Sequence, residues 1–89
     1  ANMVRIGRKP VMNYVVACVT LVNHGVKTVV VRARGQTISK AIDVVEMLRR
    51  SFMKNLEVGH VTIGSEEITR FDGKPASIST IEIYLNKKE

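Results

Sequence analysis

Residues 6–13, with the sequence Ile-Gly-Arg-Lys-Pro-Val-Met-Asn, constrain the fold of this chain most, because they join a strand pattern to a helical pattern. The strand pattern occupies residues 3–6, and Pro10 opens the long apolar run that follows. Proline is favoured at the first helical position, so Arg8 and Lys9 are expected at or beside the N-cap. Both cations then lie at the helix N-terminus, together with the free N–H groups of the first turn and the positive end of the helix dipole. The stretch therefore predicts an anion site, most often one for phosphate.

The rest of the chain alternates between helical and strand periodicity. Gly25 is the expected stop of the first helix, and Thr37 is the expected N-cap of the second. An Asp72-Gly73 pair between the last two strand patterns is typical of a tight turn, so these strands are expected to form an antiparallel hairpin that extends past the body as an arm. In order, the expected elements are a strand over residues 3–6, a helix over 10–24, a strand over 26–34, a helix over 37–53, and strands over 57–70 and 77–87.

This βαβαββ order predicts a single α/β domain over residues 1–89, an α+β two-layer arrangement with both helices on one face of a four-stranded mixed sheet. Helical spacing of apolar residues marks the expected core of the helices. These residues are Val11, Tyr14, Val15, Cys18, Leu21, Val22, Ile38, Ala41, Ile42, Val45, Leu48 and Phe52. By strand alternation, Val29, Val31 and Ala33 share one face, as do Val61 and Ile63, and Ile81, Ile83 and Leu85 are expected to point inward.

The charge balance indicates the kind of partner. Lys and Arg total 14 and Asp and Glu total 8, a net charge of +6, which favours a polyanion, nucleic acid before an anionic membrane. No apolar run reaches the roughly 18 residues of a membrane span and no signal segment is recognisable, so we expect a protein inside the cell that does not bind a membrane. The single cysteine, Cys18, has no partner for a disulfide or a metal site, so neither a metal nor a cofactor is expected.

The first two strand-to-helix joints both carry glycine and cations. In consecutive parallel βα units both helices begin at the same edge of the sheet, where ligands of open α/β sheets bind. The cations at these joints are Arg8, Lys9, Arg32, Arg34 and, within the second helix, Lys40. Neither joint has the glycine spacing of a Walker loop or a dinucleotide fingerprint, which favours contact with a run of backbone phosphates over a mononucleotide pocket. A solvated basic edge is the alternative interpretation.

The predicted hairpin adds Arg70 and Lys74 near its tip, a charged β-ribbon suited to a groove of nucleic acid. Glu66, Glu67 and Asp72 dilute this charge, so an exposed loop of mixed charge is the alternative. The chain has only two Tyr and two Phe residues, which form no stacking platform on one strand. Base stacking is therefore not expected as the principal binding mode.

Candidate catalytic groups are few. His24 at a helix end and His60 in a strand have no carboxylate or nucleophile at an informative spacing. Cys18 falls on the core stripe, the wrong place for a reactive thiol. Glu66 and Glu67 point to opposite faces of a strand and cannot act as a paired acid and base. The chain is predicted not to be an enzyme, with a small phosphate-binding enzyme as the distant alternative.

Three stretches of the chain form a specific pattern: residues 6–15, Ile-Gly-Arg-Lys-Pro-Val-Met-Asn-Tyr-Val; Ala-Arg-Gly at 33–35, followed by Ile-Ser-Lys-Ala at 38–41 and Asp43; and Ser-Thr-Ile-Glu-Ile at 79–83. In this order, and over nearly the whole chain, they closely resemble the Alba family of archaeal chromatin proteins. The resemblance implies a fold like the C-terminal domain of bacterial translation initiation factor three, which agrees with the βαβαββ order.

The resemblance also implies dimeric, largely sequence-independent binding to double-stranded DNA, and binding to RNA. The family's arms, which reach toward the minor grooves, correspond to residues 66–76, and its basic patch corresponds to Arg8, Lys9, Arg34 and Lys40. Arg8 replaces a typical lysine, so the reversible acetylation reported for some members would fall here on Lys9 alone. Gln36 stands where many members have a second arginine, which removes one phosphate contact.

Phe52 has two interpretations. Helical period places it on the core stripe, whereas the resemblance implies a dimer–dimer contact along DNA, which we favour. The sequence thus predicts a sequence-independent double-stranded-DNA-binding chromatin protein that coats and compacts DNA as a homodimer, also binds RNA, and lies in the cytoplasm on the chromosome. An RNA-binding ribonucleoprotein component is the runner-up, and a polyanion-independent assembly protein is a further alternative. The predicted nucleic-acid-binding residues are Arg8, Lys9, Asn13, Arg32, Arg34, Gln36, Lys40, Arg70 and Lys74.

Overall fold

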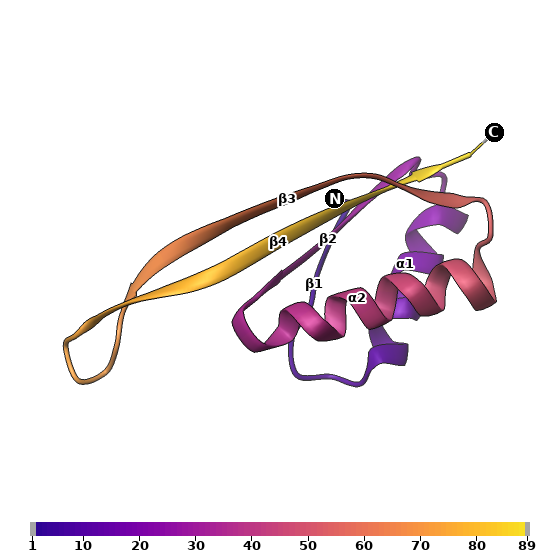
Figure 1. The fold of residues 1–89 in the computed structure, drawn as a ribbon. Coiled ribbons are helices and arrows are strands. Elements are labelled where there is room, and N and C mark those ends of the chain that lie inside the picture. The colour runs from indigo at the N-terminus through magenta and orange to yellow at the C-terminus, as the bar shows by residue number, and fades with distance from the viewer. Residues whose placement is uncertain (1, 89) are drawn as a thin grey trace.

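Helices and strands occur in the predicted order in the computed structural model, which describes residues 2–88 (Figure 1). The elements are β1 (Met3–Arg5), α1 (Val11–Asn23), β2 (Thr28–Arg34), a 3-10 turn η1 (Gly35–Thr37), α2 (Ile38–Met47), a π-helical turn η2 (Leu48–Phe52), β3 (Leu56–Thr69) and β4 (Pro75–Lys87). Gly25, the predicted stop of the first helix, has a φ of 94°, which a residue with a side chain rarely adopts. None of the helices among residues 2–88 is long and apolar enough to cross a membrane.

The sheet has the strand order β1-β2-β4-β3. β1 and β2 are parallel, and β4 lies antiparallel to both β2 and β3. Both helices cover the same face of this sheet (Figure 1). The predicted two-layer fold, a four-stranded mixed sheet with two helices on one side, is therefore confirmed, and the parallel pair brings the ends of β1 and β2 to one edge.

The core lies between the sheet and the two helices. Leu48 from the second helix and Leu85 from β4 are the largest fully buried side chains. Other buried residues are Val15, Cys18 and Val22 from α1, Ala41, Val44 and Val45 from α2, Val29, Val31 and Ala33 from β2, and Ile83 from β4. Burial raises the pKa of the Cys18 thiol to about 11, so the residue is a neutral core side chain, as predicted.

Helical period places Ile42 and Phe52 on the core stripe of the second helix, and for both residues this core placement is wrong. Ile42 has an exposed fraction of 47% and Phe52 of 50%, whereas Val44, which was not predicted, is completely buried. The π-helical turn explains Phe52, because there the N–H of Met53 donates to the carbonyl of Leu48, five residues back and 2.7 Å away. The wider turn brings Met53 against the core and rotates Phe52 to the surface. Ile42 lies beside the stripe that faces the sheet rather than on it.

The β3–β4 hairpin extends beyond the body as the predicted arm (Figure 1). β4 pairs with β2 only as far as Thr80, and five further pairs, from Ser65–Ser79 to Thr69–Pro75, join β3 and β4 alone. At about 3.3 Å per residue these pairs carry the turn roughly 16 Å past the last contact with β2. The molecule is accordingly elongated, with extents of 48 × 24 × 22 Å.

Candidate nucleic-acid interface

The loop between β1 and α1 is held by hydrogen bonds from two sides. The Tyr14 hydroxyl accepts hydrogen bonds from the N–H groups of Gly7 and Lys9, at 2.9 and 3.1 Å. Lys40 Nζ donates to the carbonyl oxygens of Gly7 and Lys9, both at 2.9 Å. The loop backbone is thus fixed by α1 and α2 together, while the side chains of Arg8 and Lys9 are exposed.

Pro10 is the N-cap of α1 rather than its first helical residue, since its ψ of 154° is extended. No side chain caps this helix and its first turn has no acidic residue. The positive end of the helix dipole is therefore not neutralised by its own first turn, and the exposed Asn13 side chain belongs to that turn. The boundary differs from the prediction by one residue, but Arg8 and Lys9 still lie beside the N-cap.

Lys40, a predicted phosphate contact, is also bonded to the backbone of the first joint. Two of the three donors of its ammonium are used by backbone carbonyls of the first joint, and its side chain is half-buried. Lys40 therefore connects the two joints across the sheet edge and positions the loop that carries Arg8 and Lys9. One donor of the ammonium is left for another acceptor.

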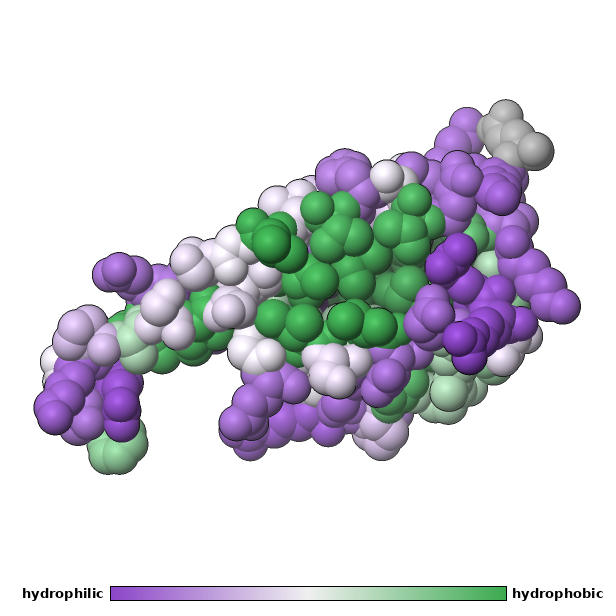
Figure 2. Space-filling model, in the orientation of Figure 1, coloured by the Kyte–Doolittle hydropathy of each residue, from purple (hydrophilic) through white to green (hydrophobic). Residues whose placement is uncertain are grey.

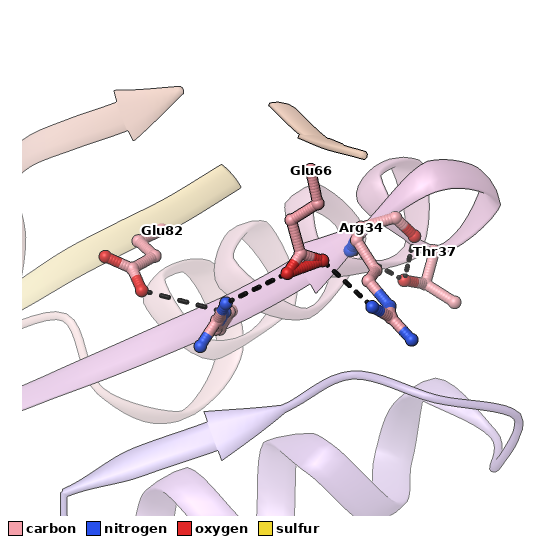
Figure 3. A network of polar contacts seen from close by, with 5 residues as sticks. Arg34, Thr37, Glu66 and Glu82 are labelled. Atoms are coloured by element: carbon pink, nitrogen blue, oxygen red, sulfur yellow. Dashed lines mark hydrogen bonds and ion pairs between the residues drawn. The ribbon is translucent and has the colours of Figure 1, made fainter. Parts of the chain in front are cut away.

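At the second joint, between β2 and α2, two arginines and two glutamates form a chain of ion pairs (Figure 3). Arg34 Nη1 donates to Glu66 Oε1 at 2.9 Å. Arg32 lies between two carboxylates, with Nη2 3.8 Å from Glu66 Oε2 and Nε 3.7 Å from Glu82 Oε2. Both predicted arginines therefore share their charge with acidic residues of the hairpin, although 63% of the Arg34 side chain is exposed. The sequence did not predict that Glu66 would pair with these arginines.

Thr37 occupies the N-cap position of α2, as predicted, but its hydroxyl makes no capping hydrogen bond to that helix. Instead Thr37 Oγ1 accepts from the Arg34 N–H at 3.2 Å and donates to the Arg34 carbonyl at 2.8 Å. Gly35 has a φ of 56°, and Gln36 beside it is exposed. This turn fixes the backbone of Arg34 at the sheet edge.

A cleft of about 310 Å³ lies between the ends of β1 and β2, lined by Arg5, Ile6, Arg32, Ala33, Arg34 and Glu66. Arg5 was missed by the sequence interpretation. The parallel register pairs it with Arg32, so the two side chains share a face, and strand alternation applied to residues 3–6 would have found it. The structure thus brings Arg5, Arg32 and Arg34 together.

The remaining predicted cations lie at the far end of the arm. Arg70 Nη2 is 3.6 Å from Asp72 Oδ2, and the N–H of Lys74 donates to Asp72 Oδ1 at 3.0 Å. The tip is separate from both joints, because five strand pairs lie between it and the body. The predicted site residues therefore form two groups, one at the sheet edge and one at the tip.

Glu82 also connects this network to the aromatic residues of the sheet. The Tyr84 hydroxyl donates to Glu82 Oε1 at 3.2 Å, and the charge of that carboxylate and the hydrogen bond raise the pKa of Tyr84. The His60 ring stacks on Tyr84 with centroids 4.0 Å apart. Among residues 2–88 no group of three or more His, Cys, Asp or Glu side chains could hold a metal ion.

A βαβαββ domain with a basic sheet edge and a projecting two-stranded arm defines a class of small α+β domains that present cations along a surface. The family model for Alba matches residues 2–65, and the chain belongs to the Alba family. A relative in Methanocella arvoryzae, named DNA/RNA-binding protein Alba, is 42% identical over 86 residues, which cover 97% of this chain and 90% of the relative.

Solved structures agree with this membership. Alba from Thermoplasma volcanium has a TM-score of 0.92 and 37% identity, covering 97% of this chain and all of that one. ALBA1 from Trypanosoma brucei has a TM-score of 0.79 and 30% identity, covering 99% of this chain and 70% of that one. The resemblance stated from the sequence motifs is confirmed, together with its fold.

Proposed function

We propose that this protein binds double-stranded DNA without regard to sequence, coats and compacts it as a homodimer, and also binds RNA. The observation that carries the proposal is the loop of residues 7–9, a rigid backbone that presents the exposed Arg8 and Lys9 beside the N-terminus of α1. A guanidinium and an ammonium held at a helix N-terminus form a site for a phosphate oxygen. The relative in Methanocella arvoryzae, named for both DNA and RNA binding, supports both ligands.

A run of backbone phosphates fits the charge distribution better than one small anion does. The cleft beside Arg34 is lined by the Glu66 carboxylate, which opposes an enclosed phosphate. The cations instead lie at separate places, on the loop with Arg8 and at the arm tip with Lys74, which five strand pairs separate from the body. Contacts of this kind position a duplex and carry no sequence information.

The homodimer is supported by an apolar face that lies open on the helix side of β3. Val61 and Ile63 pair across the ladder with Ile83 and Ile81, so they share the face that forms the core, yet Ile63 has an exposed fraction of 77%. Ile38 of α2 lines a groove with Ile63 and Ile81, and Ile42, about one turn further along α2, is 47% exposed. Figure 2 shows the apolar side chains gathered between the arm strands and the helix. In a homodimer with two-fold symmetry the same face of both copies would meet, which would bury these side chains in the second copy.

The proposal also covers a contact between dimers at Phe52, acetylation of Lys9 and the location of the protein. Half of the Phe52 side chain is exposed at the end of the second helix, which supports a contact between dimers along DNA; F52A should reduce cooperative packing on DNA more than single-dimer affinity. Lys9 is exposed and open to acetylation, which mass spectrometry of the native protein would detect. We place the protein on the chromosome in the cytoplasm, and the nucleic acid that co-purifies with it tests this and separates DNA from RNA as the main ligand.

Fluorescence anisotropy with two unrelated 30-bp duplexes over a salt series tests the main proposal. Each neutralised phosphate should contribute a slope of about −0.9 in log K against log salt. The double variant R8A/K9A should weaken binding to both sequences and make the slope less steep, whereas K27A/K54A, which removes two exposed cations at the opposite sheet edge, should change it less. A flat salt dependence of the unmodified protein would refute DNA binding through phosphates.

A further inference from the structure

Phe71, at the turn of the β3–β4 arm, is the most exposed large apolar side chain of the described chain. Its exposed fraction is 104%, whereas the other exposed apolar residues of comparable size, Ile63 and Phe52 among them, lie at 77% or below. Neighbouring side chains cover part of each of those residues, which belong to the body or to the apolar face described above. No neighbouring side chain covers Phe71.

The conformation of the turn holds Phe71 outward. The Arg70 N–H donates to the Lys74 carbonyl and the Gly73 N–H donates to the Arg70 carbonyl, both at 2.8 Å. The Asp72 carboxylate accepts from the Lys74 N–H, and Gly73 has a φ of 85°. Because these bonds close the turn at its base, the Phe71 side chain projects from the end of the arm instead of folding back onto it.

The charges around this side chain indicate what it contacts. The cations Arg70 and Lys74 stand on either side of Phe71 in sequence, and Asp72 is engaged within the turn by Arg70 at 3.6 Å and by the Lys74 N–H. An apolar protein partner would leave these cations desolvated, whereas a duplex offers phosphates to the cations and base faces to the ring. The five strand pairs of the arm consist mostly of small or polar residues and give it a narrow profile.

We propose that Phe71 enters between adjacent base pairs of the bound DNA duplex and partly unstacks them. This inference rests on the proposed DNA binding and adds a base contact that phosphate recognition does not include. Apolar side chains that enter the minor groove act in this way and kink the duplex. The contact supplements the ionic binding of the sheet edge. Because it is apolar, it should kink the DNA and leave the salt dependence of binding nearly unchanged.

Because the chain has no tryptophan, F71W provides a single fluorescent reporter at the tip. On saturation with duplex DNA, its emission should be quenched and its acrylamide quenching constant should fall at least about threefold. N55W, at the opposite end of β3 in another exposed turn, is the matched control and should change little. An F71W side chain that stays open to acrylamide on DNA overturns the proposal, and so does one already protected in the free protein, which would indicate a protein contact.

The second measurement is the affinity of F71A. It should bind about tenfold more weakly than the unmodified protein, with the same slope of log K against log salt, because stacking releases no counterions. Unchanged affinity of F71A overturns the base contact and leaves phosphate binding intact. Failure of the unmodified protein to bind duplex DNA with a steep salt dependence would overturn both the base contact and the proposed function.

Discussion

Replacing Glu66 by glutamine should strengthen DNA binding, because this carboxylate occupies the two arginines of the second joint. Its oxygens lie 2.9 Å from Arg34 Nη1 and 3.8 Å from Arg32 Nη2. A phosphate that binds these guanidinium groups must first displace Glu66. E66Q keeps the shape of the side chain and removes its charge, so both arginines become available without that competition.

The size of the effect follows from the exposure of the pairs. All three side chains are at least 36% exposed, so each pair contributes about 0.2–1 kcal/mol, and the longer contact to Arg32 contributes least. If about 0.4–1 kcal/mol is released to the phosphate contact, duplex affinity should rise about twofold to fivefold at low salt. The free energy of unfolding should fall by less than about 1 kcal/mol, since the pairs are exposed.

Titration of a labelled duplex by fluorescence anisotropy checks this expectation, with E67Q as the matched control. Glu67 is the next residue of β3, pairs with Ser77 and points to the opposite face, and its replacement changes the net charge equally. If only the net charge of the protein matters, E66Q and E67Q will bind the duplex equally well. Equal affinities, or no gain for E66Q, would refute the competition between Glu66 and phosphate.

Three further predictions concern the dimer, the loop and the core. I63D should convert the proposed homodimer to a monomer in sedimentation, whereas T62D, on the other face of β3, should not; a dimer that survives I63D would exclude this interface. K40M should accelerate hydrogen exchange of the loop amides bonded to the Tyr14 hydroxyl by about tenfold or more, and unchanged exchange would contradict the positioning role. Because burial raises the pKa of Cys18 from 9.0 to about 11, the folded state holds the thiol proton that the unfolded state loses between these pH values. The free energy of unfolding should therefore fall there by up to about 1.4 kcal/mol per pH unit, a slope that C18A should lack in denaturant titrations.

Local sequence patterns predicted the elements and their order, because periodicity is set by each segment's own residues. The exposure of Arg8 and Lys9 follows in the same way from their place beside Pro10. The bonds of Lys40 to the first joint and of Glu66 to Arg34 were not predictable, since they connect residues more than 30 positions apart whose relative placement depends on the whole sheet. Long-range contacts thus engage some of the predicted cations in bonds that local patterns do not reveal.

Sequence patterns left the exposure of two apolar residues undetermined, for separate reasons. For Ile63, alternation identified the correct face of the strand, but it does not reveal that the helices cover only part of the sheet. For Phe52, a helical period of 3.6 residues points to the core and the family resemblance to an interface, and nothing in the local sequence indicates the wider turn that exposes the side chain. Both residues are exposed at the surface, where the proposed protein contacts lie.

In the π-helical turn at the end of the second helix, contact with the core and exposure at the surface fall to two neighbouring residues. An ordinary helix would place both on one residue. Met53 contacts the core, while the neighbouring Phe52 faces outward. A change of size at Phe52 therefore leaves no cavity beneath the sheet, so the surface at this corner of the molecule is free to diverge between relatives while the interior stays constant. Selection can act there on partner contacts alone, with little cost in stability.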